Sequence, residues 1–126
     1  MTDTQKFFIS FIEIFPENSI MSLDTSDDEL LKIIVKMKDS SIVNNYTAKF
    51  QLTKENKNII LRNAINNHLE ERIHRLRVFL NSEQLFVAYD GCEVGIISRK
   101  VNITSKFVSE FIDTGVCGIV DEVPEA

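Results

Sequence analysis

Apolar side chains recur at helical spacing near the start of the chain. Phe8, Phe11, Ile12 and Phe15 share one face of a helix, and Lys6, Ser10, Glu13 and Glu17 share the opposite face. This pattern predicts an amphipathic helix that ends at Pro16, since a residue before proline disfavours helical backbone. Residues 17–28 are polar and irregular, so we expect a loop there.

Residues 29–38 fit two patterns. As a helix, they would begin with a capping box from Ser26 to Glu29 and place Leu30, Ile33, Ile34 and Met37 on one face. As a strand, they alternate apolar residues with lysines, and the β-branched run at 33–35 favours extended backbone. We expect the strand, because residues 46–53 alternate in the same way and the two could pair across a polar loop at 39–45. The helix is the alternative.

The second half of the chain gives clearer signals. From Lys54 a helical period runs to about residue 73, and the run Arg75–Leu80 then predicts a strand. Residues 81–83 predict a turn, and Asp90-Gly91 between two apolar runs predicts a two-residue hairpin, since both residues tolerate positive φ. Together these signals predict a three-strand meander.

A last helix and strand complete the predicted order of elements. Thr104 or Asn102 would cap a helix carrying Phe107, Val108, Phe111 and Ile112, with Gly115 as its C-terminal stop and a short strand at 116–120. The order predicts an α+β fold of two layers, with a mainly antiparallel sheet and helices packed on one face. At 126 residues, we expect a single domain over 1–126. In the first predicted hairpin, formed by residues 29–38 and 46–53, polar residues alternate with apolar ones. One face of the sheet would therefore contact solvent or a partner.

Composition and charge narrow the class of protein. Apolar residues make up 44% of the chain and charged residues 26%, which is typical of a folded globular domain. The longest apolar run is interrupted by Ser10 and Glu13, so we expect no membrane span and a cytoplasmic protein. The two cysteines, Cys92 and Cys117, are too few for a disulfide framework, and we expect both in the core.

The net charge of −5 is unevenly distributed. Residues 111–126 contain four acidic residues and no basic one, whereas residues 51–110 are slightly basic. An acidic protein with an acidic end is a poor nonspecific ligand for nucleic acid and a suitable partner for a basic protein. The alternative is that these charges are ordinary solubilising residues.

Catalytic motifs are not found along the chain. There is no phosphate-binding glycine loop, nucleophile elbow or zinc-protease motif. His68 and His74 are six residues apart, so on one helix they would point about 120° away from each other and would not share a metal. A cysteine and His68 could form a nucleophilic pair, but only the residue types suggest it. We therefore expect no enzyme, no metal and no cofactor.

A basic strip offers a second functional class. Arg72, His74, Arg75 and Arg77 lie close to Phe79, a combination that could follow a phosphate backbone in a small nucleic-acid-binding or regulatory module. Against this, Glu70 and Glu71 would pair with neighbouring arginines within a helix. We regard a helix surface of mixed charge as the better interpretation.

Three segments of the C-terminal third carry a family resemblance, namely Tyr89–Ser98, Phe107–Ile112 and Cys117–Val120. Their hydrophobic and turn pattern resembles the closing segment of small bacterial immunity proteins of contact-dependent growth inhibition and polymorphic toxin systems. The resemblance implies a cytoplasmic protein that binds one cognate toxin domain, often a nuclease, and blocks its active site or its access to substrate.

Charge complementarity indicates which residues would contact such a toxin. A nuclease cleft is usually basic, so an acidic inhibitor gains association rate and specificity from opposite charge. The candidate toxin-binding residues are Asp90 and Glu93 at the hairpin tip, and Asp113, Asp121 and Glu122 around the last helix and strand. If the last strand lies near the hairpin, these would form one acidic rim. Alternatively, Asp90 is simply the residue that the turn requires and the others are solvated.

Overall fold

The protein alternates helices with strands, as a computed structural model shows for residues 1–124. The helical elements are α1 (Asp3–Ile14), α2 (Asp28–Val35), α3 (Lys54–Asn67), the 3-10 turn η1 (Leu69–Arg72), α4 (Ser105–Phe107) and the π-helical turn η2 (Val108–Ile112). The strands are β1 (Ile20–Asp24), β2 (Ser40–Ile42), β3 (Thr47–Gln51), β4 (Arg75–Leu80), β5 (Glu83–Tyr89), β6 (Val94–Ser98) and β7 (Cys117–Val120).

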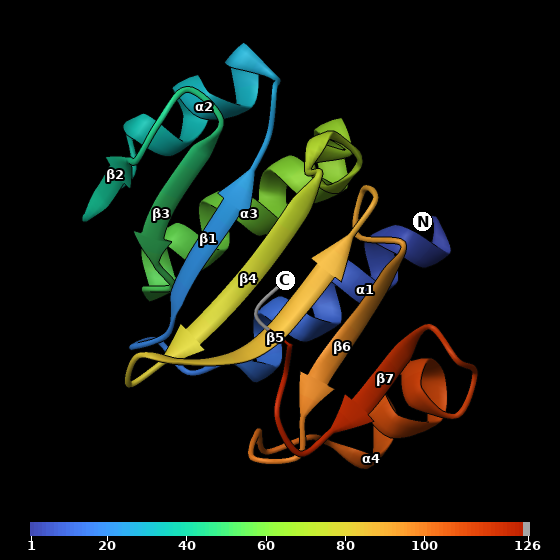
Figure 1. The fold of residues 1–126 in the computed structure, drawn as a ribbon. Helices are drawn as coiled ribbons and strands as arrows, with labels where there is room; N and C mark the ends of the chain where they lie inside the picture. The colour runs from blue at the N-terminus through green and yellow to red at the C-terminus, as the bar shows by residue number, and fades with distance from the viewer. Residues whose placement is uncertain (125–126) are drawn as a thin grey trace.

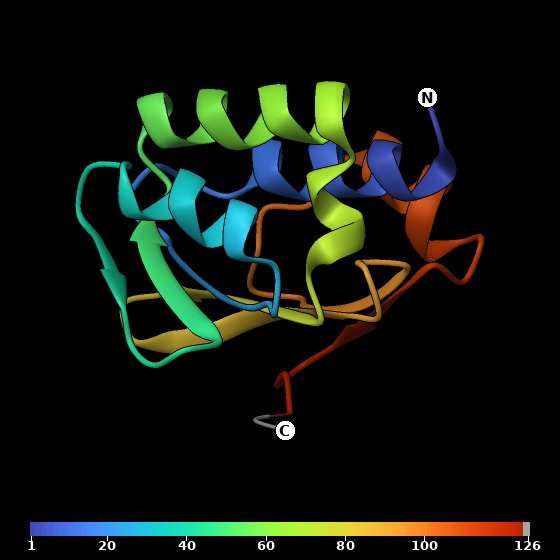
Figure 2. The ribbon, with the colours of Figure 1, turned by 90° about the horizontal axis from the view of Figure 1, so that it is seen from above.

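The seven strands form one sheet in the order β2-β3-β1-β4-β5-β6-β7 (Figure 1). Every neighbouring pair is antiparallel except β6 and β7, which are parallel. The helices lie together on one face of this sheet (Figure 2). This arrangement confirms the predicted α+β class with two layers and a mainly antiparallel sheet.

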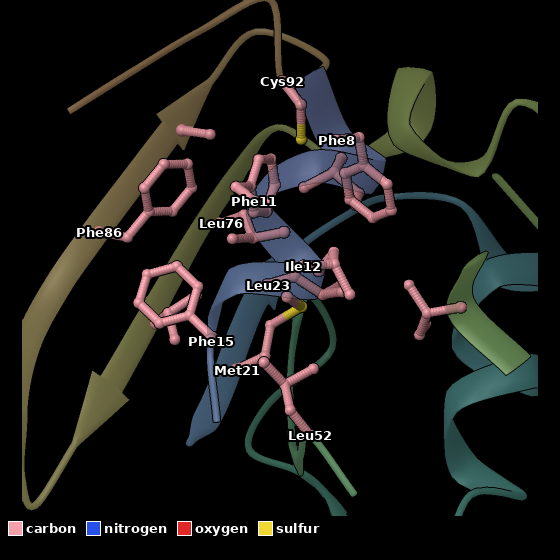
Figure 3. Packing of buried hydrophobic residues seen from close by; sticks show 14 of the residues in the cluster. Phe8, Phe11, Ile12, Phe15, Met21, Leu23, Leu52, Leu76, Phe86 and Cys92 are labelled. Atoms are coloured by element: carbon pink, nitrogen blue, oxygen red, sulfur yellow. The ribbon is translucent and has the colours of Figure 1, made fainter. Parts of the chain in front are cut away.

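Aromatic side chains of α1 form the centre of the core. Phe7, Phe8, Phe11 and Phe15 are buried against the sheet, and the ring centroids of Phe11 and Phe86 are 4.3 Å apart (Figure 3). A capping box begins α1, since the Thr2 hydroxyl accepts from the Gln5 backbone N–H and the Gln5 side chain accepts from the Thr2 N–H. The helix predicted from the aromatic pattern is confirmed.

The strand expected over residues 29–38 is wrong, because residues 28–35 form α2. The Asp27 carboxylate caps this helix by accepting from the Glu29 N–H at 2.9 Å. Leu30 and Ile34 are one helical turn apart and both buried, whereas Val35, which a strand would have buried, is 57% exposed. The predicted partner of β3 is replaced by β2 on one side and β1 on the other.

The loop expected at 17–28 contains a central strand, β1. It pairs with β3 on one side and β4 on the other, although these strands come much later in the chain. Met21 and Leu23 point into the core and alternate with Ser22. This alternation covers too few residues to stand out in the sequence, which explains the incorrect prediction.

The predicted meander is confirmed as β4, β5 and β6, and so is the turn predicted at 81–83, but the second turn differs from the prediction. The two-residue turn with positive φ at both positions is at Asn81 and Ser82, with φ of 51° and 66°. Between β5 and β6, Tyr89 pairs with Val94, so Asp90–Glu93 form a four-residue loop. The hairpin itself is present, and its tip is wider than predicted.

The C-terminal elements follow the prediction closely. The Thr104 hydroxyl caps α4 by accepting from the Phe107 N–H at 3.1 Å, and Gly115, at φ +83°, follows the end of η2. Beyond β7 the chain turns onto the sheet face opposite the helices (Figure 2), where the Gln84 side-chain amide donates to the Pro124 carbonyl at 3.0 Å.

Candidate functional site

A shallow pocket lies where the β5–β6 loop meets η1 and the start of β4. Its volume is about 400 Å³. The lining residues are Thr4, Glu71, Ile73, His74, Asp90, Gly91 and Glu93. Three of them carry carboxylates, so we call this the acidic pocket. It brings together residues from three separate parts of the sequence.

Backbone hydrogen bonds fix the loop that carries Asp90 and Glu93. The Asp90 N–H donates to the His74 carbonyl at 3.0 Å, and the Gly91 N–H donates to the Ile73 carbonyl at 2.8 Å. Gly91 has φ +72°, a backbone conformation that favours glycine. Asp90 has φ 53°, which aspartate tolerates better than most residues.

The buried side chain of Cys92 attaches the same loop to the hydrophobic core. The side chain points toward α1 (Figure 3). Burial raises the pKa of the Cys92 thiol well above its ordinary value, and burial raises the pKa of Cys117 to about 12. Both cysteines are therefore core thiols, as predicted, and the thiolate form that nucleophilic catalysis needs is disfavoured at both.

The charges of the acidic pocket are poorly neutralised. Asp90 and Glu93 are exposed, and within residues 1–124 neither carboxylate forms an ion pair. Glu71 has an imidazole, His68 Nδ1, at 3.9 Å, and no Lys or Arg within the same described range forms an ion pair with it. Two other acidic residues, Asp24 and Asp27, are neutralised, since they form ion pairs with arginines at 3.1 and 3.2 Å. The pocket therefore keeps a local negative charge.

The five predicted toxin-binding residues do not form one rim. Asp90 and Glu93 line the acidic pocket, whereas Asp113 is exposed after η2 and lies outside it. Strand β7 runs parallel to β6, and their last pair is Ser98 and Val120. Asp121 and Glu122 come directly after this pair and therefore lie at the end of the strands opposite the hairpin tip. Asp121 is paired there with Arg99 at 2.9 Å. Glu125, which we included in the acidic end, lies outside the described residues.

The predicted basic strip is largely paired with acidic or polar side chains. Arg72 pairs with Asp27, Arg75 pairs with Asp24, and His74 Nε2 lies 3.0 Å from the Ser26 hydroxyl. The Arg77 guanidinium lies over the Phe79 ring at 5.9 Å. The ion pairs predicted with Glu70 and Glu71 are replaced by pairs to residues near β1 and α2. Few cations of this strip remain to bind phosphates.

The premise that His68 and His74 share a helix is wrong. Helix α3 ends at Asn67, His68 is its left-handed C-cap with φ 51°, and His74 lies beyond η1. Glu70 and Glu71, which we had treated as surface partners of arginines, occupy the η1 turn instead. Their sequence signal is weak, because two glutamates after a helix also fit an ordinary solvated surface.

Searches of the chain against protein-family models, curated proteins and solved structures give no match. Among the helices of the described residues, none combines the length and apolar character needed to cross a membrane.

Proposed function

We propose that this chain is an inhibitor that binds a basic toxin domain, like the bacterial immunity proteins that its C-terminal third resembles. The observation that carries the proposal is the acidic pocket, where Glu71, Asp90 and Glu93 surround one cavity without a Lys or Arg partner in the described chain. Surface carboxylates of one sign, held together at a recess, attract and orient a partner of opposite charge.

The pocket suits a cationic side chain of the partner. A cavity of about 400 Å³ admits a lysine or arginine side chain, and charge-assisted hydrogen bonds from it to carboxylates are stronger than neutral ones. The hydrogen-bonded loop holds Asp90 in place before binding, which lowers the entropy lost on association. Val94, 47% exposed beside Glu93, adds an apolar contact next to the charged centre.

In this proposal the partner is a nuclease domain whose basic cleft binds nucleic acid. Covering that cleft with an acidic surface would occlude the active site or block access of the substrate. The site of action is the cytoplasm, where the toxin's substrate lies. The proposed role needs no chemistry from the inhibitor, because exclusion of substrate is sufficient.

The test compares two pairs of charge-neutralising substitutions. D90N/E93Q removes two charges from the pocket, and asparagine tolerates the positive φ at residue 90. D121N/E122Q removes two charges from the opposite end of β6 and β7 and serves as the matched control. Each variant is mixed with the toxin domain encoded by the neighbouring gene, and affinity is measured at low and high salt together with growth protection.

We expect wild-type protein to form a salt-sensitive one-to-one complex. D90N/E93Q should lose about tenfold or more in affinity, whereas D121N/E122Q should remain close to wild type. Equal losses in both variants would show that net charge alone matters and would contradict the pocket assignment. A salt-insensitive complex would shift the contact to the exposed apolar hairpin of Ile42, Val43 and Tyr46, and no complex at all would refute the inhibitor proposal.

A further inference from the structure

A compact group of metal-ligand side chains lies at the end of α3. His68, Glu70 and Glu71 each offer one ligand atom, and these atoms lie within 4.8 Å of one another. His68 Nδ1 is 3.7 Å from Glu70 Oε2 and 3.9 Å from Glu71 Oε1. The left-handed backbone of His68 ends the helix and allows η1 to bring the two glutamates back toward the imidazole.

Glu70 is the unusual member of this group. Its side chain is 0% exposed, and within residues 1–124 neither carboxylate oxygen has a hydrogen-bond partner at normal geometry. The nearest opposite charge would be a protonated His68, whose nitrogen is too far for a normal hydrogen bond. The adjacent arginine, Arg72, is engaged with Asp27 instead. Buried carboxylates are ordinarily hydrogen-bonded, paired with a lysine or arginine, or bound to a cation, and Glu70 has none of these partners among the described residues.

We propose that His68, Glu70 and Glu71 bind a divalent transition-metal ion of the Zn²⁺ type. Imidazole nitrogens and carboxylate oxygens both bind Zn²⁺ in proteins, and the imidazole favours such a transition metal over Mg²⁺ or Ca²⁺. Ligand atoms about 2.0–2.1 Å from a tetrahedral ion are about 3.4 Å from one another. The ligand atoms here lie within 4.8 Å of one another, so binding requires a contraction of at most about 1.4 Å. That contraction involves mobile groups, because the His68 and Glu71 side chains are 47% and 60% exposed.

One of the three proposed ligands, His68, borders a surface recess. This recess of about 540 Å³, lined by Met1, Thr2, Gln5, Ile65 and His68, opens beside the imidazole. Three protein ligands leave a fourth coordination position for water or for a group from a partner. Bound metal would supply the positive charge that the buried Glu70 carboxylate lacks. This inference concerns the isolated chain and does not depend on the proposed inhibitor function.

The experiment uses the untagged chain of residues 1–126 in metal-free buffer at about pH 7.5, with ZnCl₂ as the probe. Calorimetry gives the stoichiometry and affinity, and thermal unfolding gives an independent readout, since an ion that binds the folded state raises Tm. H68Q and E70Q each remove one ligand while keeping similar size. H74Q removes the other histidine of the chain, which lies outside the cluster, and is the matched control.

We expect one Zn²⁺ per chain and a rise in Tm for wild type and H74Q. H68Q and E70Q should each weaken Zn²⁺ binding at least tenfold, and Mg²⁺ should not compete at equal concentration, because it prefers oxygen ligands. The proposal is overturned if wild-type protein shows no saturable binding. It is equally overturned if H68Q and E70Q bind Zn²⁺ as tightly as wild type, or if H74Q loses as much affinity as they do.

Discussion

Replacing Glu70 by glutamine removes a buried charge while keeping the shape of the side chain. Desolvation by burial raises the pKa of the Glu70 carboxyl above its ordinary value of 4.5. The folded protein therefore retains this proton at pH values where the unfolded chain has released it. By linkage, the contribution of Glu70 to stability is fully present below the unfolded pKa and is lost as pH rises through the folded pKa. E70Q lacks this loss, so we expect it to become more stable than wild type as pH rises.

The magnitude follows from the burial of Glu70. One proton changes the free energy of unfolding by at most about 1.4 kcal/mol per pH unit within the window. An unpaired buried polar group costs about 1–3 kcal/mol, and a charged one costs more. The side-chain amide introduced by E70Q would also lack partners, which offsets part of the gain at every pH. Over an experimental range from about pH 4.5 upward, the pH-dependent part should reach about 1–3 kcal/mol in favour of E70Q.

Urea unfolding at several pH values, with EDTA present, measures this difference directly. E93Q is the control, because its exposed side chain loses a charge without relief of desolvation. We expect the stability difference between E70Q and wild type to grow with pH, and that between E93Q and wild type to stay nearly constant. A difference for E70Q that is the same at both ends of this pH range would refute the reasoning about its burial.

Three further substitutions test the packing and capping described above, all by urea unfolding. F11A should cost about 3–5 kcal/mol, because Phe11 is fully buried and its ring contacts Phe86; a cost below about 1 kcal/mol would contradict this packing. G95A should cost about 1–3 kcal/mol, since a Cβ would lie 3.0 Å from Phe7 Cζ. G118A should be tolerated, because a Cβ at Gly118 would meet no atom within 4 Å among the described residues other than its chain neighbours. Equal costs for the two substitutions would contradict the close approach at Gly95. T53A should cost about 0.5–2 kcal/mol, because the Thr53 hydroxyl accepts from the Asn56 N–H at the start of α3; an unchanged free energy of unfolding would show that this cap contributes nothing.

Elements with their own strong periodicity could be predicted from the sequence. The aromatic face of α1, the meander and the capped C-terminal helix each contain enough local signal to identify them. Residues 28–35 could not be assigned from local signal, because their sequence fits both a helix and a strand. Tertiary contact decided the outcome: Leu30 and Ile34 reach the core together only from a helix. Strand β1 was missed because its five residues are specified mainly by partners far along the chain.

The candidate site depended on features that local pattern does not contain. The predicted acidic rim assumed only that the last strand lies near the hairpin. Strand β7 does lie beside β6, but it runs parallel to β6 and so carries Asp121 and Glu122 away from the hairpin tip. Residue alternation carries no information about strand direction. The burial of Glu70 was also hidden, since a glutamate after a helix is normally solvated. In contrast, Asp90 and Glu93 were placed correctly at the tip of the β5–β6 hairpin, because Asp-Gly between apolar runs is a local signal.

The η1 turn links the two proposed sites, because Glu71 lines the acidic pocket and also belongs to the metal cluster. An ion held by Glu71 would withdraw one carboxylate from the pocket, so the two ligands would oppose each other's binding by the same factor. The remaining residues separate the two sites. Asp90 and Glu93 lie outside the metal cluster, and His68 and Glu70 lie outside the pocket lining. A loss of partner affinity that occurs in D90N/E93Q alone therefore reports on partner binding. A loss of Zn²⁺ affinity that occurs in H68Q alone reports on metal binding. Either proposal can therefore fail while the other stands.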